Sequence, residues 1–275
     1  MFKITCVVDN NAKENTGLRS EHGLSFWIET EDGNLIFDTG QTSAAFALNL
    51  GLLALKMQDA AALALSHAHY DHTGGLEFAL SQNKHLKIYA HSDLFQPRYS
   101  FREGEYRSIG IAISQEELSS RADLHLSDAP QEILPNLWTT GEISPRPEAE
   151  GRSPHHFIRV NGEWKPDPYL DDLSLVLKTS AGLVLICGCC HAGLLNTLLY
   201  VQQNFSGQII SILGGTHLNA TREAGLRHVA ETLETRHPNV NLYLNHCTGQ
   251  KSQVLLANRF GARVKAFPAG ATLEI

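Results

Sequence analysis

The sequence predicts an α/β (α+β) protein built as a four-layer αββα sandwich. The chain has 275 residues with 43% hydrophobic content, enough to bury a large core. It reads as two β-rich halves, each followed by helical segments, and this order is typical of sheets covered by helices. The length is at the upper end for one such sandwich, so we expect one domain over residues 1–275.

The first half is predicted to begin with strands and to end in a β-α-β unit. The turn Glu31-Asp32-Gly33-Asn34 separates two apolar runs, which favours a hairpin. Residues 63–66 form a short apolar run that is typical of a buried strand. We expect strands at 2–8, 24–30, 35–38, 63–66 and 86–90, and helices at 43–53 and 75–82.

The second half repeats this organisation after a long interruption. Between about residues 97 and 172 the periodicity fades, and Pro, Gly, Arg and Glu become common. We interpret this segment as an irregular insertion or lid over the active-site face, with short strands near 123–127 and 137–139, because long loops in compact folds are usually functional or disordered. Beyond it we expect strands at 173–179, 183–187, 209–213 and 241–244, and helices at 194–203 and 221–234.

Composition narrows the class of partner. The formal net charge of −7 argues against a protein that wraps nucleic acid or lies on an anionic membrane. The N-terminus shows no export signal, and no run approaches about 18 apolar residues, so we expect a soluble, cytoplasmic protein without a transmembrane helix. We expect a small-molecule substrate as partner, and the oligomeric state is left open.

The cysteines are expected to be reduced thiols. Five occur, an odd number in a chain without an export signal. The run Cys187-Gly188-Cys189-Cys190 has no second, suitably spaced pair, so a structural zinc ribbon is not predicted.

A cluster of metal-ligand side chains directly follows the predicted strand at 63–66. In His67-Ala68-His69 an extended backbone places both imidazoles on one side, because side chains alternate with period two. Asp71 and His72 follow as the chain turns toward Thr73-Gly74-Gly75, and they can face a second position nearby. This mixed N/O set suits Zn²⁺, with Mn²⁺ or Fe as alternatives, and leaves room for a bridging hydroxide.

The motif H-x-H-x-D-H after a strand resembles the signature of the metallo-β-lactamase superfamily. The segment 35–40, LIFDTG, looks like that family's second signature, whose Asp braces the metal loop. Segments 188–193, 214–218 and 245–249 resemble the branch labelled as dihydropterin-ribofuranosyl-aminobenzene phosphate synthase-like metal-dependent hydrolases. The resemblance covers nearly the whole chain and implies the metallo-β-lactamase fold and a metallohydrolase (EC 3) activity.

The resemblance also implies a ligand set. His67 and His69 match ligands of a first metal, Asp71 and His72 match ligands of a second, and His246 matches the terminal ligand of the second.

Two positions depart from the superfamily pattern. Gly188-Cys189 stands where many members have Gly-Asp with a bridging Asp, and Asp171-Asp172 stands where many supply a further His. We therefore infer that His191 completes the first site, that Cys189 coordinates as a thiolate, and that Asp172 coordinates or orients a ligand.

Other polar residues are candidates for catalysis or substrate binding. His217 follows Gly214-Gly215 at a strand end and is expected to donate a proton or contact metal. His155 and His156 lie in the long insertion and are candidates for a substrate lid. His22 and His91 could line the same cleft, but the favoured interpretation of both is a hydrogen-bonded structural histidine.

Arginines concentrate in the insertion of an otherwise acidic chain. Guanidinium groups there could bind a substrate phosphate or carboxylate. Arg146 is the representative substrate candidate, within the set Arg98, Arg102, Arg107, Arg146 and Arg152.

The expected mechanism is hydrolysis by a metal-bound hydroxide, since a bound cation lowers the pKa of its water. Asp71 would orient that nucleophile and His217 would protonate the leaving group of a phosphoester, lactone or thioester. Two alternatives remain open: an iron-dependent redox enzyme on the same fold, and a non-catalytic sensor with one weakly held metal.

Overall fold

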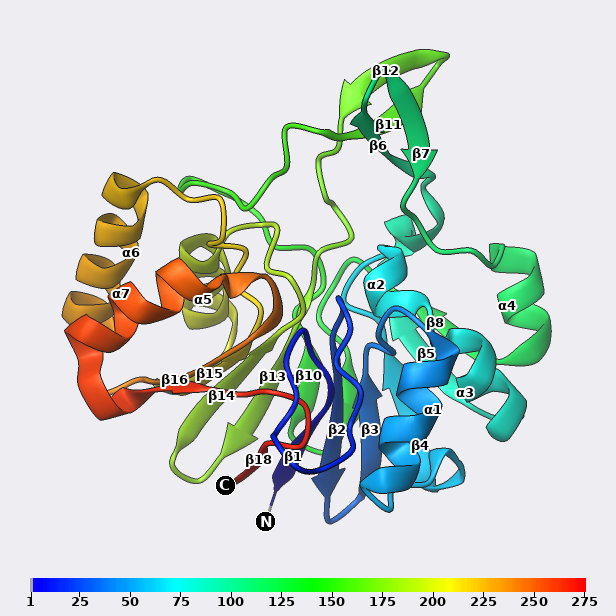
Figure 1. Cartoon of the computed structure of the whole chain (residues 1–275), viewed down its shortest axis with the longest axis horizontal. Coiled ribbons are helices and arrows are strands. Elements are labelled where there is room, and N and C mark those ends of the chain that lie inside the picture. The colour runs from blue at the N-terminus through cyan, green and yellow to red at the C-terminus, as the bar shows by residue number, and fades with distance from the viewer. Residues whose placement is uncertain (1) are drawn as a thin grey trace.

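The computed structural model describes residues 2–275 and contains two seven-stranded sheets that face each other between layers of helices. Figure 1 shows α1, α3 and α4 beside one sheet and α5, α6 and α7 beside the other. Both chain ends lie at the edge opposite the small upper sheet. The predicted four-layer αββα sandwich is confirmed.

The first sheet has the strand order β18-β1-β2-β3-β4-β5-β8. Its β18, β1, β2 and β3 pair antiparallel, whereas β3, β4, β5 and β8 run parallel. Its strands are β1 (Lys3–Val8), β2 (Ser25–Thr30), β3 (Gly33–Phe37), β4 (Ala60–Ala64), β5 (Lys87–Ala90), β8 (Asp123–Leu126) and β18 (Thr272–Glu274). Its helices are α1 (Ser43–Leu52), α2 (Tyr70–Thr73), α3 (Leu76–Gln82) and α4 (Gln115–Arg121), with the 3-10 helices η1 (Met57–Asp59) and η2 (Ser92–Phe95).

The second sheet has the order β17-β16-β15-β14-β13-β10-β9. Strands β14, β15, β16 and β17 run parallel. Its strands are β9 (Glu132–Leu134), β10 (Leu137–Thr139), β13 (Ser174–Thr179), β14 (Gly182–Cys187), β15 (Ile209–Gly214), β16 (Asn241–Leu244) and β17 (Val264–Ala266). Its helices are α5 (Leu194–Asn204), α6 (Glu223–Arg236) and α7 (Gln250–Phe260), with η3 (His246–Thr248) and η4 (Gly261–Arg263).

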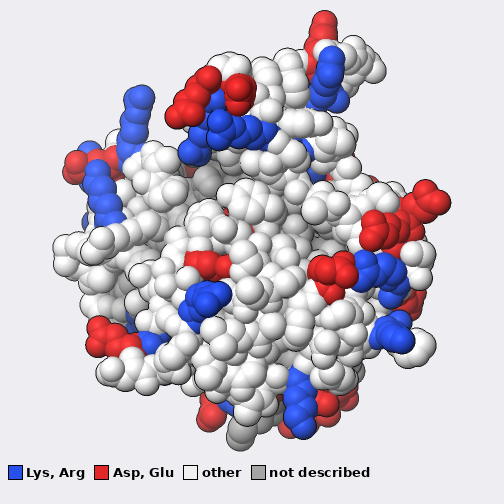
Figure 2. All heavy atoms as spheres, turned by 45° about the vertical axis from the view of Figure 1, so that its right-hand side comes forward, with Lys and Arg blue, Asp and Glu red and all other residues white. Residues whose placement is uncertain are grey.

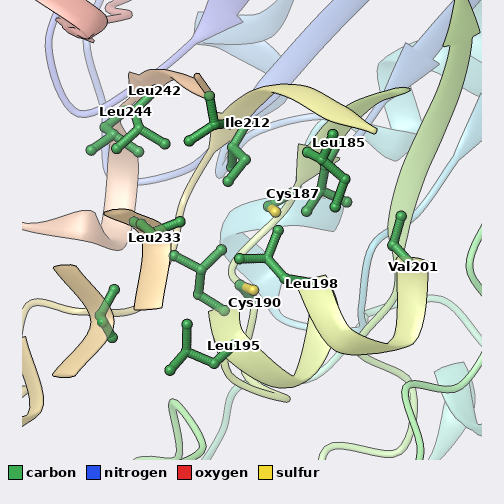
Figure 3. Packing of buried hydrophobic residues seen from close by; sticks show 14 of the residues in the cluster. Leu185, Cys187, Cys190, Leu195, Leu198, Val201, Ile212, Leu233, Leu242 and Leu244 are labelled. Carbon is green, nitrogen blue, oxygen red and sulfur yellow. The ribbon is translucent and has the colours of Figure 1, made fainter. Parts of the chain in front are cut away.

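Side-chain alternation along the strands divides the apolar residues among three buried clusters. In β2, Phe26 and Ile28 pack between the two sheets, while Trp27 faces the helices. In β14, Ile186 packs between the sheets, while Leu185 faces α5. Figure 3 shows that second face, where Leu185 and Cys187 of β14 lie near Leu198 of α5, and Leu195 lies near Cys190. Each sheet is therefore apolar on both faces, as a central layer requires.

The expectation of an irregular insertion over residues 97–172 was wrong in part. Within it, α4, β8, β9 and β10 belong to the main sandwich. A separate four-stranded antiparallel sheet, which we call the small sheet, has the order β12-β11-β6-β7 and projects at the top of Figure 1. Its strands are β6 (Arg98–Arg102), β7 (Glu105–Ser108), β11 (His156–Val160) and β12 (Glu163–Pro166). These strands are short, charged and mostly exposed, so their period-two signal is weak.

The other differences between the predicted and observed elements lie in segments whose hydrophobic pattern is weak. Strand β4 begins at Ala60 rather than residue 63, because three alanines precede Leu63 and carry little strand preference. Helix α7 was not predicted, since its buried stripe is only Ser252, Leu256 and Phe260. Strands β17 and β18 were not predicted either, and each has three residues.

The parallel strands end at one edge of the sandwich, where their following loops meet. Strand β4 leads to the loop 65–72, which we call the metal loop, and β14 leads to the loop 188–193. Strands β15 and β16 lead to His217 and His246. The carboxyl edge of parallel strands is where α/β proteins place their sites.

On the face in Figure 2, Lys and Arg side chains are scattered among Asp and Glu rather than gathered in one stripe. Within residues 2–275, no helix has the length and apolar character needed to cross a bilayer.

Candidate metal centre

Three imidazoles on one side of the centre have a ring nitrogen without a partner. The Nε2 atoms of His67, His69 and His191 are buried, and each lacks a hydrogen bond within the described part of the chain. The His67 ring centroid lies 4.5 Å from that of His69 and 4.9 Å from that of His191. Because buried polar atoms without partners are costly, these three neighbouring imidazoles indicate a site for a cation.

Cys189 lies between this group and a second one. His67, Cys189 and His191 offer donor atoms within 4.8 Å of one another, and so do His72, Cys189 and His246. The Cys189 Sγ is 3.2 Å from Nε2 of His72 and 3.2 Å from Nε2 of His246. The thiol therefore occupies the place between two candidate metal positions.

Asp71 extends the second group. Its Oδ2 lies 3.7 Å from Nε2 of His72 and 3.6 Å from Nε2 of His246. Burial raises the pKa of Asp71, but His72 and a hydrogen bond from His22 lower it more, so its pKa lies well below the usual range. Asp71 is thus an anionic ligand candidate.

Hydrogen-bond partners of Nδ1, the ring nitrogen that points away from the centre, orient four of the imidazoles. Each rear contact leaves Nε2 directed at the centre, as in metal sites whose ligands are held from behind. The contacts pair His67 Nδ1 with Ser66 Oγ (2.9 Å), His72 Nδ1 with Asp38 Oδ2 (2.7 Å), His191 Nδ1 with the Gly151 carbonyl (3.0 Å) and His246 Nδ1 with Asn10 Oδ1 (2.9 Å).

Asp38 braces the metal loop, which agrees with the role implied by the second signature. Its Oδ1 accepts a hydrogen bond from the Ser66 amide at 2.7 Å, and its Oδ2 accepts one from the Ser66 hydroxyl at 2.7 Å. Burial lowers the pKa of His72, yet the Asp38 and Asp71 carboxylates raise it more, so the net shift is upward.

Strained backbone is concentrated around the centre. Five non-glycine residues there have positive φ angles, a region that costs about 1–3 kcal/mol per residue. They are Asp38 (61°), Tyr169 (50°), Cys190 (62°), His217 (47°) and His246 (46°). The surrounding contacts over-determine these conformations, as is common where side chains must converge on a ligand.

His22 lies at this site, which is the alternative that the sequence left open rather than the structural role that it favoured. His22 Nε2 lies 3.2 Å from Asp71 Oδ2, and the His22 and His246 rings are 5.2 Å apart. His22, Asp71 and His246 form a third group of donors within 4.8 Å. The available sequence signal was Gly23, which has a φ of 150° and where a Cβ would lie only 2.5 Å from the Asp71 carbonyl oxygen, so a larger residue would not allow this close approach.

Asp171 and Asp172 hold backbone amides rather than joining the donor groups. Asp171 Oδ2 accepts from the Ala68 amide at 2.8 Å, and Asp172 Oδ2 accepts from the Ala192 amide at 2.8 Å. Burial raises the pKa of Asp172 to about 6. Of the two roles expected for Asp172, the geometry supports orienting the loop that carries His191.

Three further side chains line the centre beside the first group. The His217 ring lies 4.3 Å from that of His191, and the His156 ring lies 5.1 Å from that of His69. The Tyr169 ring stacks on His191 at 4.1 Å, and its hydroxyl is 2.8 Å from His156 Nδ1. Burial lowers the pKa of both His217 and His156 to about 4.

His155 and Arg146 do not have the substrate positions expected of them. His155 is exposed, and its backbone carbonyl accepts from the Phe101 amide in the small sheet. Arg146 donates to the carbonyls of Ile143, Pro168 and Tyr169 and to Glu150, so its guanidinium holds a loop together. The sequence showed that Arg146 lies in the insertion, but it could not show which acceptors surround its guanidinium in the folded chain.

The donor set suits a transition metal. Imidazole, thiolate and carboxylate ligands in this number fit zinc, and also iron or manganese, better than a hard cation such as Mg²⁺.

Comparisons with known proteins agree with this geometry. The family model of the metallo-β-lactamase superfamily matches residues 19–191. Two proteins of Methanocaldococcus jannaschii are similar over almost the whole chain. One is named 7,8-dihydropterin-6-methyl-4-(β-D-ribofuranosyl)-aminobenzene-5'-phosphate synthase, with 27% identity over 99% of this chain and 96% of its own. The other is the uncharacterized protein MJ0448, with 30% identity over 94% of each chain.

Solved structures show the same fold. The crystal structure of Tm1679, described as a metal-dependent hydrolase of the β-lactamase superfamily, matches with a TM-score of 0.86 and 25% identity, covering 100% of this chain and 99% of the other. YhfI from Bacillus subtilis matches with a TM-score of 0.60 and 15% identity over 100% of both chains, which shows the fold alone. By sequence, fold and donor arrangement, the chain belongs to the metallo-β-lactamase superfamily.

Proposed function

We propose that this chain is a metal-dependent hydrolase that acts on a small, anionic or phosphorylated substrate with a phosphoester, lactone or thioester bond. The observation that carries the proposal is the set of three unpartnered, buried Nε2 atoms, two of which belong to histidines, His67 and His191, that are grouped with Cys189. A second donor group on the other side of the thiol supports a centre for two ions, with Zn²⁺ preferred over Mn²⁺ or Fe.

The ligands divide into two sets that share Cys189. His67, His69 and His191 would hold the first ion, and Asp71, His72 and His246 would hold the second. When bound, such ions supply an acidified water and a Lewis acid for the substrate oxygen. Cys189 stands between the two sets and would bind metal as a thiolate, because a metal-ligand cysteine is deprotonated.

Asp71 and His217 are the proposed catalytic residues. The ionised Asp71 accepts a hydrogen bond and thereby orients the attacking water. His217 is uncharged at neutral pH, because burial lowers its pKa to about 4. A neutral imidazole still donates one N–H hydrogen bond, so His217 stabilises negative charge as it develops on the substrate oxygen or the leaving group.

The relatives support the substrate class more than the reaction type. One relative is named as a synthase of a phosphate-bearing product, and Tm1679 is described as a metal-dependent hydrolase. A phosphorylated substrate is compatible with both names. Turnover assays that compare transfer to water with transfer to an added acceptor distinguish the two reaction types.

Elemental analysis of the purified, tag-free protein is the first test. Near two equivalents of zinc or manganese are expected, with loss in His69→Ala and retention in the matched control His85→Ala at an exposed position. Hydrolysis of members of a phosphoester, lactone and thioester panel by the loaded protein would support the function. No metal after reconstitution, or two metals without any turnover, would refute it.

A redox enzyme is the second candidate, and the Cys189 thiol is the observation that favours it. A thiolate between two positions also suits iron. Stoichiometric iron with oxygen consumption would replace the hydrolase proposal. Tight ligand binding without turnover would instead indicate a sensor.

We also propose a reducing, cytoplasmic location and a small-molecule partner rather than nucleic acid or membrane. All five cysteines are buried and unpaired, which agrees with a reducing compartment. Mass spectrometry of alkylated protein purified without reductant should find five free thiols.

A further inference from the structure

The two faces of the small sheet differ in chemistry. Side chains alternate along its strands, so residues paired across β6 and β11 share a face. Tyr99 pairs with Phe157, and this face carries an aromatic cluster in which Tyr106 stacks on Trp164 at 3.6 Å. The opposite face carries Ser100, which pairs with His156.

The face with His156 is the one that lies over the metal centre. The His156 ring is 5.1 Å from the His69 ring, and its Nδ1 contacts the Tyr169 hydroxyl. Arg102 shares this face, because it follows Ser100 by two residues, about 7 Å along the strand. Burial first, and then the charges of His217 and Arg102, lower the pKa of His156 to about 4, which agrees with the placement of Arg102 on the face of this ring.

Arg102 is the free guanidinium among the arginines of the insertion. Within residues 2–275 it has no ion-pair or hydrogen-bond partner, although it is paired in register with Glu105. Glu105 is instead contacted by Arg107, which also lies near Glu103. The remaining arginines of the set are occupied: Arg98 by Asp93, Asp167 and Asp171, Arg146 by Glu150 and three carbonyls, and Arg152 by Glu150.

We propose that Arg102 binds the anionic group of the substrate, a carboxylate or a phosphate, while the bond to be broken lies at the metal centre. This inference rests on the proposed function and narrows its substrate class to molecules with an anionic group at a distance from the reacting bond. A guanidinium suits the task because it donates two parallel hydrogen bonds to carboxylate or phosphate oxygens. Lys165 also lies on this face, where it pairs with Ile158, so it is the competing cation that the experiment must exclude.

Matched hydroxamates separate Arg102 from the metal centre. Monohydroxamates of succinic, glutaric and adipic acid carry a metal-binding group and a remote carboxylate, and uncharged acyl hydroxamates of equal length serve as references. Isothermal titration calorimetry on the metal-loaded protein measures the Kd of each acid and of the uncharged hydroxamate of equal length. The ratio of the two Kd values is the preference for the acid at that length. Terminal phosphonates in place of the carboxylate identify which anion is preferred.

The wild type should prefer the acid at one chain length, and Arg102→Ala should reduce that preference by about 10–100-fold while the uncharged hydroxamate binds as before. Arg159→Ala is the matched control, since Arg159 lies on the aromatic face over Trp164. The inference would be overturned if the wild type showed no preference for the acid, or if Arg102→Ala left that preference unchanged. It would also be overturned if Lys165→Ala, rather than Arg102→Ala, abolished the preference. Failure of every hydroxamate to bind would refute the metal-based function, and this inference with it.

Discussion

Replacing Asp38 with Asn should weaken metal binding while largely preserving the fold. The carboxylate accepts three hydrogen bonds of 2.7 Å, from the Ser66 amide, the Ser66 hydroxyl and His72 Nδ1. An amide keeps one oxygen for the Ser66 amide but places its NH₂ group against His72 Nδ1. The proton on His72 must then move to Nε2, which is the atom that faces Cys189 and His246. The protonated Nε2 cannot bind a metal.

The expected loss follows from this tautomer change. Removing an outer hydrogen-bond partner of a metal ligand typically costs about 10–100-fold in affinity, or about 1.4–2.7 kcal/mol. Asp38→Ala should also destabilise the fold by about 1–3 kcal/mol, because it leaves the buried Ser66 amide without an acceptor. Asn avoids that cost.

Competition with a chromophoric zinc chelator measures the affinity, and urea denaturation of the metal-free protein measures stability. Asp123→Asn, at an exposed position in β8, is the matched control. A zinc affinity of Asp38→Asn within twofold of wild type would refute the view that Asp38 sets the His72 tautomer.

The same residue predicts a pH effect in the metal-free protein. Because Asp38 and Asp71 raise the pKa of His72, the charged imidazolium stabilises the fold below its unfolded pKa of about 6.5, and this stabilisation is lost as pH rises through the folded value. The difference in unfolding free energy between wild type and Asp38→Asn should therefore be larger near about pH 6 than near about pH 9. A difference that grows with pH would contradict this assignment.

Three further predictions test other parts of the site. Cys189→Ser should remove the sulfur-to-metal charge-transfer absorption of the cobalt-substituted protein, and an unchanged spectrum would exclude the thiolate as ligand. His217→Ala should retain both metals and lower kcat by about 10²–10³-fold, whereas His217→Gln, whose amide donates a neutral hydrogen bond, should recover part of it; equal loss in both variants would instead favour proton donation. Arg98→Met should lower the urea-unfolding free energy by about 3–5 kcal/mol, because three carboxylates lose their buried cation, and a change below about 1 kcal/mol would show that they are protonated instead.

The sequence predicted best the parts of the site that are set locally. His67, His69, Asp71 and His72 lie within six residues, and the strand before them determines which way they point. Sequence resemblance added His191 and His246, which the structure places beside the same Cys189.

The positions of His22, Arg146 and the small sheet were not predicted, because they depend on contacts between residues far apart in the sequence. His22 reaches Asp71 only because the loop after β1 folds over the metal loop, where the Leu24 amide donates to the Asp71 carbonyl. Arg146 looked available because its acceptors are mostly backbone carbonyls, which composition does not reveal. The small sheet was missed because its aromatic face is satisfied within the sheet itself, without a strong alternating pattern in any one strand.

The buried Arg98 makes the small sheet part of the frame that holds the metal loop. Its guanidinium contacts Asp171, and the other oxygen of Asp171 holds the Ala68 amide between the two histidines of the loop. Detaching the sheet would expose buried charges and release that amide, so sheet and loop should open as one cooperative unit. Native-state hydrogen exchange should then give the amides of β6, β11 and the metal loop a common opening free energy. Replacing segment 97–172 with a shorter loop would therefore remove the support of His67 and His69 together with the small sheet that covers the centre.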